Sequence, residues 1–229
     1  MTNGQRPTTK VRILIVAATL PEIEPIVARF QNASERGPRM KTYTHAGHEV
    51  DVLVTGVGMV ATSAWCSRVL AQTRYNVGLN VGICGSFDPA LAPGTVVHVV
   101  TDRIAELGAE DGETFLSIAE LNLPCEHEFV NTAPPSNAAL SRLPAVTGIT
   151  VNTVHGNARS IAAVTRRFKP QVESMEGAAF MYACLIHDLS FAQVRAVSNV
   201  VETRNPDTWN MAEAIHNLGR TALEILDHV

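Results

Sequence analysis

The sequence lacks most of the features that assign a protein to a class directly. It has no P-loop, no nucleophile elbow with a Ser-His-Asp set, no internal repeat and no low-complexity linker. Its apolar runs are far too short to span a membrane, and the polar segment MTNGQRPTTK at residues 1–10 has no hydrophobic region of a signal peptide. These absences predict a cytoplasmic protein with no membrane partner, in which residues 1–10 form a disordered tail.

Charge is scarce and evenly spread. Only 17% of the residues are charged, the formal net charge is -4, and Lys and Arg are scattered along the chain. A surface that binds nucleic acid or an anionic membrane needs clustered basic residues, so neither partner is expected. The expected partner is a small molecule or a second copy of the chain.

Paired metal-binding and redox motifs are missing as well. None of the four cysteines lies in a CxxC pair, and three lie in apolar runs, which predicts reduced thiols in the core. They are Cys66, Cys84, Cys125 and Cys184. His45 and His48 precede Glu49, but this order differs from the zinc motif HExxH, so a surface pair is the favoured interpretation. We expect neither a metal nor an organic cofactor.

Short apolar segments alternate with helical patterns, and 229 residues suffice for one domain, expected over 11–229. The segments are rich in Val and Ile without strict alternation, as in strands that are covered on both faces. Strands are expected at 11–18, 50–56, 77–83, 94–100, 148–154 and 191–201, and helices at 21–31, 61–73, 176–189 and 207–229. This order predicts an α/β fold with a largely parallel central sheet, and residues 102–147 are expected to form an insertion or a lid.

In such sheets, ligands bind beyond the carboxyl ends of the strands, so the residues that follow each strand are the candidates for a site. Glu22 follows the first strand, and two interpretations stand. Thr19 and Glu22 have the spacing of a capping box at the start of a helix, in which the carboxylate accepts a backbone N–H. The carboxylate is equally placed at a strand end, where it could accept a proton from water.

The segment GVGMVA at 56–61 matches the dinucleotide fingerprint between a strand and a helix. The acidic residue that should bind the ribose about 20 residues later is missing, because the next strand runs into GICGS. Nicotinamide binding is therefore disfavoured. Close approach of the backbone to another ligand, or tight packing, explains the glycines better.

Two charged residues lie in segments that look buried. Glu176 opens the apolar helix GAAFMYACLI, where the helix dipole alone could explain it, but a buried carboxylate needs partners such as the two hydroxyls of a ribose. Arg195 lies within an apolar strand, and a buried guanidinium is costly unless it is paired with a carboxylate or faces a polar cleft.

Taken in order, these segments resemble the nucleoside phosphorylase superfamily, in particular its methylthioadenosine/S-adenosylhomocysteine nucleosidase branch and, within that, the futalosine hydrolases. The segments that carry the resemblance are ILIVAATLPEIEPI, TGVGMVAT, NVGICGSFDPALAPGTVV, VNTVHG, VESMEGAAF and VRAVSNVVETRNPDTWN. The resemblance implies a three-layer α/β/α sandwich with a mixed, mostly parallel sheet, usually assembled as a homodimer. It also implies hydrolysis of futalosine to hypoxanthine and dehypoxanthinyl futalosine, a step in menaquinone biosynthesis.

The resemblance assigns roles residue by residue. Glu22 falls on the carboxylate that activates water, and Arg195 on the arginine near that water, which is expected to pair with Glu22 and orient it. Met175 and Glu176 fall on the ribose contacts, with Glu176 taking the hydroxyls, and Ser198 lies beside the position that contacts purine N7. The remaining substrate contacts are Ile83, Cys84 and Gly85 at a strand end, and Val154 and His155, whose backbone holds the base.

The chain departs from the adenine-cleaving nucleosidases at two of these positions. It has Ile83 where they have Ser, which removes one polar group near the water, and Asn199 where they have Asp. An Asp can protonate the departing base, whereas an Asn can offer only hydrogen bonds. A 6-oxopurine presents N7 and O6 as neighbouring acceptors, so the two amide hydrogens of Asn199 suit hypoxanthine and would stabilise it as it leaves.

Several alternatives remain at this point. Arg204 could pair with the benzoate carboxylate of futalosine or be a solvated loop residue. An adenine-releasing nucleosidase stays open, and so does a phosphorylase, although Arg195 is the one evident cation for phosphate and Glu22 would repel an anion. A non-catalytic nucleoside-binding module is disfavoured, because binding alone needs no water-activating carboxylate.

Overall fold

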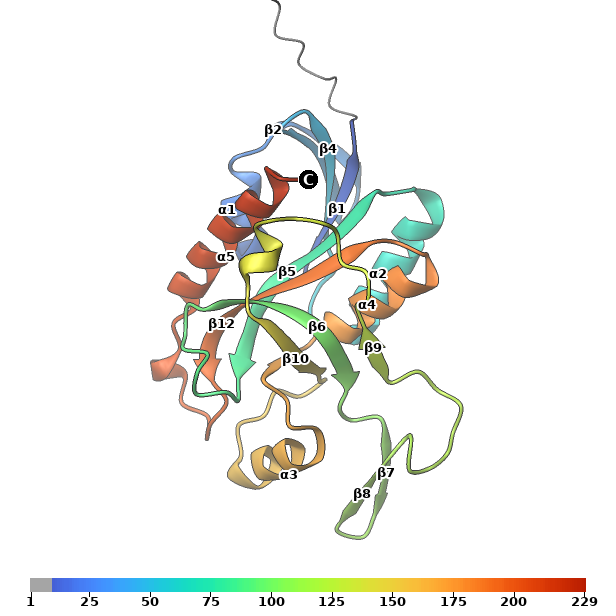
Figure 1. Ribbon diagram of the computed structural model, residues 1–229, viewed down its shortest axis with the longest axis vertical. Helices are drawn as coiled ribbons and strands as arrows, with labels where there is room; N and C mark the ends of the chain where they lie inside the picture. The colour runs from blue at the N-terminus through green and yellow to red at the C-terminus, as the bar shows by residue number, and fades with distance from the viewer. Residues whose placement is uncertain (1–9) are drawn as a thin grey trace, which may run out of the picture.

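The structure is a computed structural model and is described for residues 10–229 (Figure 1). The tail expected over 1–10 lies outside these residues except for Lys10, whose ammonium lies 3.7 Å from the Glu49 carboxylate. In this part of the chain no helix is both long and apolar enough to cross a bilayer.

Strands and helices alternate through most of the chain. The helices are α1 (Leu20–Val27), α2 (Met59–Gln72), α3 (Ala158–Phe168), α4 (Gly177–Ile186) and α5 (Met211–Leu226), with short 3-10 turns at Leu140–Arg142 and Pro206–Thr208. The strands are β1 (Arg12–Ala17), β2 (Gln31–Gly37), β3 (Met40–His45), β4 (His48–Val54), β5 (Val77–Ser86), β6 (Val96–Ile104), β7 (Gly108–Asp111), β8 (Thr114–Ser117), β9 (Glu128–Val130), β10 (Ala145–Thr150), β11 (Val172–Ser174) and β12 (Phe191–Val200).

The main sheet is mixed, as expected. Its order is β11-β10-β6-β12-β5-β1-β4-β3-β2, with β9 paired to β6. The neighbours β12, β5, β1 and β4 run parallel, whereas β12 with β6 and the β4-β3-β2 margin are antiparallel. The short strand β11 pairs with β10 on one side and with β5 on the other, so five strands close into a ring at this end of the sheet.

Two helix layers cover the opposite faces of the sheet. Along β1, Ile13 and Ile15 pack in the cluster that includes α1 and α5, whereas Leu14 and Val16 pack in the cluster that includes α2 and α4. Figure 1 shows these two helix pairs on either side of the strands. A strand that is apolar on both faces is required for such a three-layer arrangement, which explains why these segments do not alternate.

The expected elements are present, but several end elsewhere. The strand expected at 148–154 is β10, which ends at Thr150, and the segment after it is a loop; the helix expected at 207–229 begins at Met211. The surface interpretation of the HxxH pair is wrong for His48, which is buried and accepts from the Val11 N–H through its ring (3.3 Å). The core interpretation of the cysteines is confirmed for three of them, whereas Cys125 is exposed; none is disulfide-bonded.

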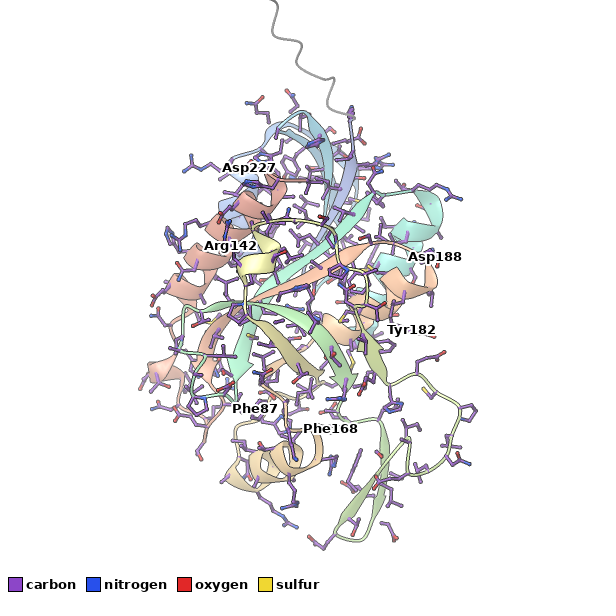
Figure 2. All side chains as sticks on the ribbon, in the orientation of Figure 1. Phe87, Arg142, Phe168, Tyr182, Asp188 and Asp227 are labelled. Atoms are coloured by element: carbon purple, nitrogen blue, oxygen red, sulfur yellow. The ribbon has the colours of Figure 1, made fainter. Side chains whose placement is uncertain are left out.

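The irregular part at 102–147, expected as an insertion or a lid, is only partly built into the main sheet. Its first residues continue β6, β9 pairs with β6, and β7 and β8 form a hairpin of their own. This hairpin and α3 line a cavity of about 990 Å³. Phe87 and Phe168 pack on the small cluster above α3, at the end of the sheet where Figure 2 labels them.

Candidate functional site

Glu22 lies at the start of α1, directly after β1, and is 6% exposed. Its Oε2 accepts hydrogen bonds from the Thr19 backbone N–H (2.9 Å) and from the Thr19 hydroxyl (2.7 Å), which is the expected cap contact. Its Oε1 accepts the Ile83 N–H from β5 (3.1 Å). The capping contact thus fixes one oxygen of the carboxylate and leaves the other facing the end of the sheet.

Glu176 is the residue before α4 and is 6% exposed. Its Oε1 accepts the backbone N–H of Gly58, which precedes α2 (3.0 Å). Gly58 has φ +99°, a conformation that a residue with a side chain rarely adopts. The glycine-rich turn that resembles a dinucleotide fingerprint therefore serves to present an N–H to a carboxylate from the other half of the chain.

Arg195 lies in β12 and is 1% exposed. Its Nη1 lies 3.7 Å from Glu176 Oε2, its Nη2 donates to Asn80 Oδ1 (2.5 Å), and its Nε donates to Gln193 Oε1 (3.1 Å). The expectation that Arg195 pairs with and orients Glu22 needs correction, because among residues 10–229 its ion pair is with Glu176. Glu22 is oriented instead by Thr19 and Ile83, since the backbone delivers two N–H donors there.

Glu22 and the Arg195 guanidinium still meet beside Gly82 of β5, and Glu176 lies 3.7 Å from the same guanidinium. A methyl group added at Gly82 would lie 2.1 Å from Arg195 Nη1 and 2.9 Å from Glu22 Oε1. The absence of a side chain at Gly82 is therefore what lets both groups reach the strand.

A buried polar chain continues behind Arg195. Gln193 Nε2 donates to Asp102 Oδ2 (3.0 Å), and the Thr150 hydroxyl donates to Asp102 Oδ1 (2.9 Å). The Ala178 N–H at the start of α4 donates to Thr150 Oγ1 (2.8 Å). This chain ties the guanidinium to the helix that Glu176 precedes. The amide side chains of Asn80 and Gln193, lone polar groups within Val-rich strands, were the signal in the sequence that could have revealed it.

Burial dominates the acid–base properties of the site. It raises the pKa of Glu176, against the opposing effects of the Arg195 charge and the Gly58 N–H, and the nearby Glu22 charge adds to the increase. Burial likewise raises the pKa of Asp102 to about 6, although Gln193, Thr150 and Arg195 favour its ionised form. The site thus concentrates more negative than positive groups in a region of low exposure.

The end of β12 carries a bulge that places Ser198 and Asn199 next to β5. Val197 pairs with Cys84 and Asn199 with Gly85, so Ser198 is the extra residue. The Ser198 hydroxyl lies within donating distance of the Cys84 carbonyl (3.1 Å) and of Asn199 Oδ1 (2.8 Å). Asn199 Nδ2 donates to the Val200 carbonyl (3.0 Å), which leaves one amide hydrogen for a ligand.

Glu173 and His155 form a close pair beside Asn199. Glu173 is 3% exposed; its Oε1 accepts the His155 backbone N–H (3.0 Å), and its Oε2 lies 2.6 Å from His155 Nδ1. A methyl group added at Gly85 would lie 3.4 Å from Asn199 Nδ2 and 3.5 Å from Glu173 Cγ. The role of the Glu173 carboxylate was missed in the sequence, because its partner is 18 residues earlier.

The remaining expected contacts differ in what they present. Met175 and Ile83 are partly exposed, whereas the Cys84 thiol is buried in an apolar cluster, where burial raises its pKa to about 12. Cys84 therefore contacts the end of β12 through its carbonyl, which lies near the Ser198 hydroxyl, and its thiol faces the apolar cluster. Val154 is 39% exposed.

Arg204 is exposed but not free of contacts. Its guanidinium lies over the Trp209 ring, 4.9 Å from the centroid. Its backbone N–H donates to the Gly156 carbonyl (3.0 Å). The loop after β12 is thereby tied to the loop that carries His155.

The arrangement brings two carboxylates, a guanidinium and an amide to the carboxyl ends of β1, β5, β11 and β12. Glu22 has an oxygen available to take a proton from water, and Glu176 can accept hydrogen bonds from hydroxyls. Within residues 10–229, no three or more His, Cys, Asp or Glu side chains are grouped so as to hold a metal ion.

The fold is that of a nucleoside-processing enzyme. The chain belongs to the phosphorylase superfamily, whose family model matches residues 12–228.

Individual relatives carry more specific names than the superfamily does. The chain is 29% identical to a futalosine hydrolase of Thermus thermophilus, over 76% of this chain and 80% of that one. It is 30% identical to a futalosine hydrolase of Streptomyces coelicolor, over 72% and 73% of the two chains. The native structure of futalosine hydrolase of Helicobacter pylori superposes with a TM-score of 0.81 at 14% identity, over 95% of this chain and 97% of that one, which supports the fold.

Proposed function

We propose that the protein is a nucleosidase that hydrolyses the N-ribosidic bond of futalosine and releases hypoxanthine. The observation that carries this proposal is the meeting of Glu22 and Arg195 beside Gly82, with Glu176 paired to the same guanidinium, in a chain whose named relatives include futalosine hydrolases. The reaction needs a base for water and a partner for the ribose, and the two carboxylates have these two functions.

The ribose side of the reaction uses the two carboxylates differently. Glu176 accepts hydrogen bonds from the ribose hydroxyls, held in place by the Gly58 N–H and by the charge of Arg195. Glu22 Oε1 takes a proton from a water molecule, whose oxygen forms a bond to the anomeric carbon. Met175, which adjoins Glu176 and is partly exposed, packs on the ribose.

On the base side, the bond from the anomeric carbon to the purine nitrogen breaks, and its electron pair passes to the purine. Asn199 donates to N7 and O6 of the departing base, aided by Ser198, which lies within hydrogen-bond distance of its carbonyl oxygen. Hydrogen bonds directed at charge that develops only in the transition state accelerate the step. One amide hydrogen now donates to the Val200 carbonyl, so a small rotation of Asn199 accompanies binding of the base.

Water rather than phosphate is the proposed nucleophile. Arg195 is 1% exposed, and its nitrogens are engaged by Gln193, Asn80 and Glu176. A phosphate would have to displace these partners and approach two carboxylates at a cost in free energy. These contacts support hydrolysis over phosphorolysis.

The finer assignments belong to the same proposal. We place the reaction in menaquinone biosynthesis and in the cytoplasm, where a reducing environment keeps the cysteines as thiols. We propose one catalytic domain over 11–229 and a homodimer. Val57 and Val60, which lie within two residues of Gly58, are 56% and 82% exposed, and a second copy would cover them.

The test is product analysis with four nucleosides: futalosine, aminodeoxyfutalosine, inosine and methylthioadenosine, each with and without inorganic phosphate. We expect hypoxanthine from futalosine at the same rate in both buffers, with no release of adenine. Glu22→Gln is the matched variant and should lower kcat by about 10³-fold or more.

Two results would overturn the proposal. Adenine release from methylthioadenosine or aminodeoxyfutalosine at a rate above that of futalosine would keep the nucleosidase but change its substrate. A strict requirement for phosphate would make the protein a phosphorylase.

A further inference from the structure

The Arg195 guanidinium is held in place by two uncharged side chains. Its Nε donates to Gln193 Oε1 (3.1 Å) and its Nη2 donates to Asn80 Oδ1 (2.5 Å), and both amides are buried. An amide oxygen orients a guanidinium without neutralising it. The positive charge therefore stays available to the Glu176 carboxylate, which lies 3.7 Å from Nη1.

Gln193 is in turn fixed through both polar atoms of its side chain. A guanidinium only donates hydrogen bonds, so the amide oxygen faces Arg195 and the NH2 group faces away from it. The NH2 group donates to Asp102 Oδ2 (3.0 Å) and to Met181 Sδ (3.2 Å). Turning the amide over would set donor against donor at Arg195 and oxygen against carboxylate at Asp102, so the amide has one favourable orientation.

Asp102 and Gln193 also lie directly against the residue that follows Glu176. A methyl group added at Gly177 would overlap both Asp102 Oδ2 and Gln193 Oε1. The backbone beside Glu176 can approach this closely because Gly177 has no side chain. The two polar side chains therefore contact Arg195 on one side and the backbone next to its carboxylate partner on the other.

Packing alone does not explain this polar pair. Asp102 and Gln193 are both buried, and burying a carboxylate and an amide costs free energy that apolar side chains would not cost. The neighbours of Gln193 in β12, Ala192 and Val194, belong to an apolar core cluster. The pair thus interrupts an apolar strand at the place where it can hold the guanidinium.

We propose that Gln193, fixed by Asp102, positions the Arg195 guanidinium against Glu176, and that the contact of Glu176 with the ribose hydroxyls depends on it. This inference rests on the proposed function, because it concerns the ribose contact of the same site. Gln193 and Asp102 touch neither the substrate nor the water in it, so both are positioning residues that act through Arg195.

Two substrates that differ in one ribose hydroxyl test this role. Futalosine and 2′-deoxyfutalosine are compared on the same protein sample, and the ratio of their kcat/KM values is determined. The folded fraction of the sample cancels in this ratio, so a loss of stability alone leaves it unchanged. In Gln193→Met, which keeps a side chain of similar length, Arg195 Nε loses its acceptor. We expect the ratio to fall by about 10-fold.

Asn131→Leu is the matched control. Asn131 is also a buried amide, and it holds the other end of β12 by donating to the Phe191 carbonyl (2.6 Å). This variant should lose stability and keep the ratio of the unmodified protein. Glu176→Gln is the positive control, and it should lower the ratio at least as much as Gln193→Met does.

Asp102 provides a second test through the same amide. Asp102→Ala removes the acceptor of Gln193 Nε2, so the amide is no longer fixed and the ratio should fall. Asp102→Asn keeps an acceptor at that place, and its ratio should stay within about 3-fold of that of the unmodified protein. A side chain that only fills the core would show no such rescue of the ratio.

The outcomes separate the two proposals. If the unmodified protein releases no hypoxanthine from futalosine, or if Glu176→Gln keeps the ratio, the proposed function or its ribose assignment fails, and the inference fails with it. If Glu176→Gln lowers the ratio but Gln193→Met and Asp102→Ala change it no more than Asn131→Leu does, the positioning role alone is overturned.

Discussion

Glu22 shows how one carboxylate can satisfy two interpretations of a sequence. The Thr-x-x-Glu spacing predicts a helix cap, and the structure has that contact, yet the second oxygen accepts an N–H from β5 at the site. Helix capping uses one oxygen of the carboxylate, and the proposed proton transfer would use the other. A local motif therefore identified the residue and its orientation, but not the Ile83 contact, which comes from a strand 61 residues later.

Gly82 provides the first prediction at this scale. In Gly82→Ala the new methyl group would overlap Arg195 Nη1 and crowd Glu22 Oε1, so both groups must move. We expect kcat/KM for futalosine to fall by roughly 10²-fold, as expected for a displacement of catalytic groups by about an ångström. Steady-state kinetics would measure the loss.

Gly78→Ala is the matched control on the same strand. Its methyl group would meet Leu189 and Phe180 side chains instead, at 3.0 and 3.4 Å. This variant should lose stability while the folded fraction keeps its turnover. Wild-type kinetics in Gly82→Ala would contradict the convergence of charges at that strand.

Asp102 leads to a prediction about pH. Its folded-state pKa is raised from 3.8 to about 6, so between these values the folded protein holds more protons than the unfolded chain. Stability contributed by this group must therefore decrease as the pH rises from about 4 to about 6, by an amount on the order of 3 kcal/mol at most. In Asp102→Asn this contribution to the slope disappears.

Urea unfolding of both proteins between pH 4 and pH 7 measures the difference. The exposed residue Asp111, in the β7–β8 hairpin, supplies the control substitution Asp111→Asn, which should follow the unmodified protein. Parallel pH curves for the unmodified protein and Asp102→Asn would show that Asp102 does not titrate in this window.

Among the elements, the strands with apolar sequences were predicted and those with polar sequences were not. β1, β5 and β12 lie in the middle of the sheet and read as continuous apolar runs. β2 is QNASERG, with six exposed residues, and is a strand only because β3 offers it hydrogen-bonding partners. Pairing of this kind depends on the tertiary structure, so no local pattern could have indicated it.

The same limit applies to the site. The residues at strand ends, Glu22, Glu176 and Asn199, could be found from the order of the segments, because parallel strands bring their carboxyl ends together. The partners of Arg195 could not, since Glu176, Asn80 and Gln193 are equally acceptable partners in a sequence and only the register of β12 against β5 selects them.

Asp51 in β4 accepts hydrogen bonds from side chains of β1, β2 and β3, and it leads to a prediction about the stability of this part of the sheet. It is fully buried in β4 and accepts from Arg12, Arg36, Tyr75 and Thr42. Asp51→Asn should lower the free energy of unfolding by about 2–4 kcal/mol, because two arginines lose their shared carboxylate and remain partly solvated. Turnover per folded molecule should be unchanged, since the cluster lies away from the carboxyl ends of the strands.

Denaturant unfolding measures this effect, with Glu49→Gln as control. Glu49 pairs with Arg12 from a half-solvated position and should contribute less than about 1 kcal/mol. Equal losses in the two variants would mean that burial of Asp51 adds nothing to its pairing.

At the scale of the whole molecule, the site occupies one end of the sheet and its loops come from distant parts of the chain. The loop after β12 crosses to the loop before α3, and Arg204 is fixed there on Trp209. If Arg204 pairs with the benzoate carboxylate of futalosine, Arg204→Ala should raise KM for futalosine by about 10-fold and leave inosine cleavage unchanged.

Arg220→Ala, at an exposed position of α5, serves as the control for loss of a positive charge. Steady-state kinetics of the unmodified protein, Arg204→Ala and Arg220→Ala on futalosine and on inosine measure the effect. Equal losses on futalosine and inosine would show that Arg204 acts on the loop and not on the carboxylate.

The polar sequence of the edge strand β2 affects how readily copies of the protein aggregate. A sheet edge exposes unpaired N–H and C=O groups that can recruit another chain, and long apolar edges of this kind promote aggregation. Among residues 10–229, β11 at the far end of the main sheet is paired on both sides, so the long open edge of this sheet is β2. The strand β2 carries Glu35 and Arg36 and no large apolar side chain, so pairing with a strand of another chain there would bury no apolar surface. The strand that the sequence did not predict therefore disfavours fibre formation.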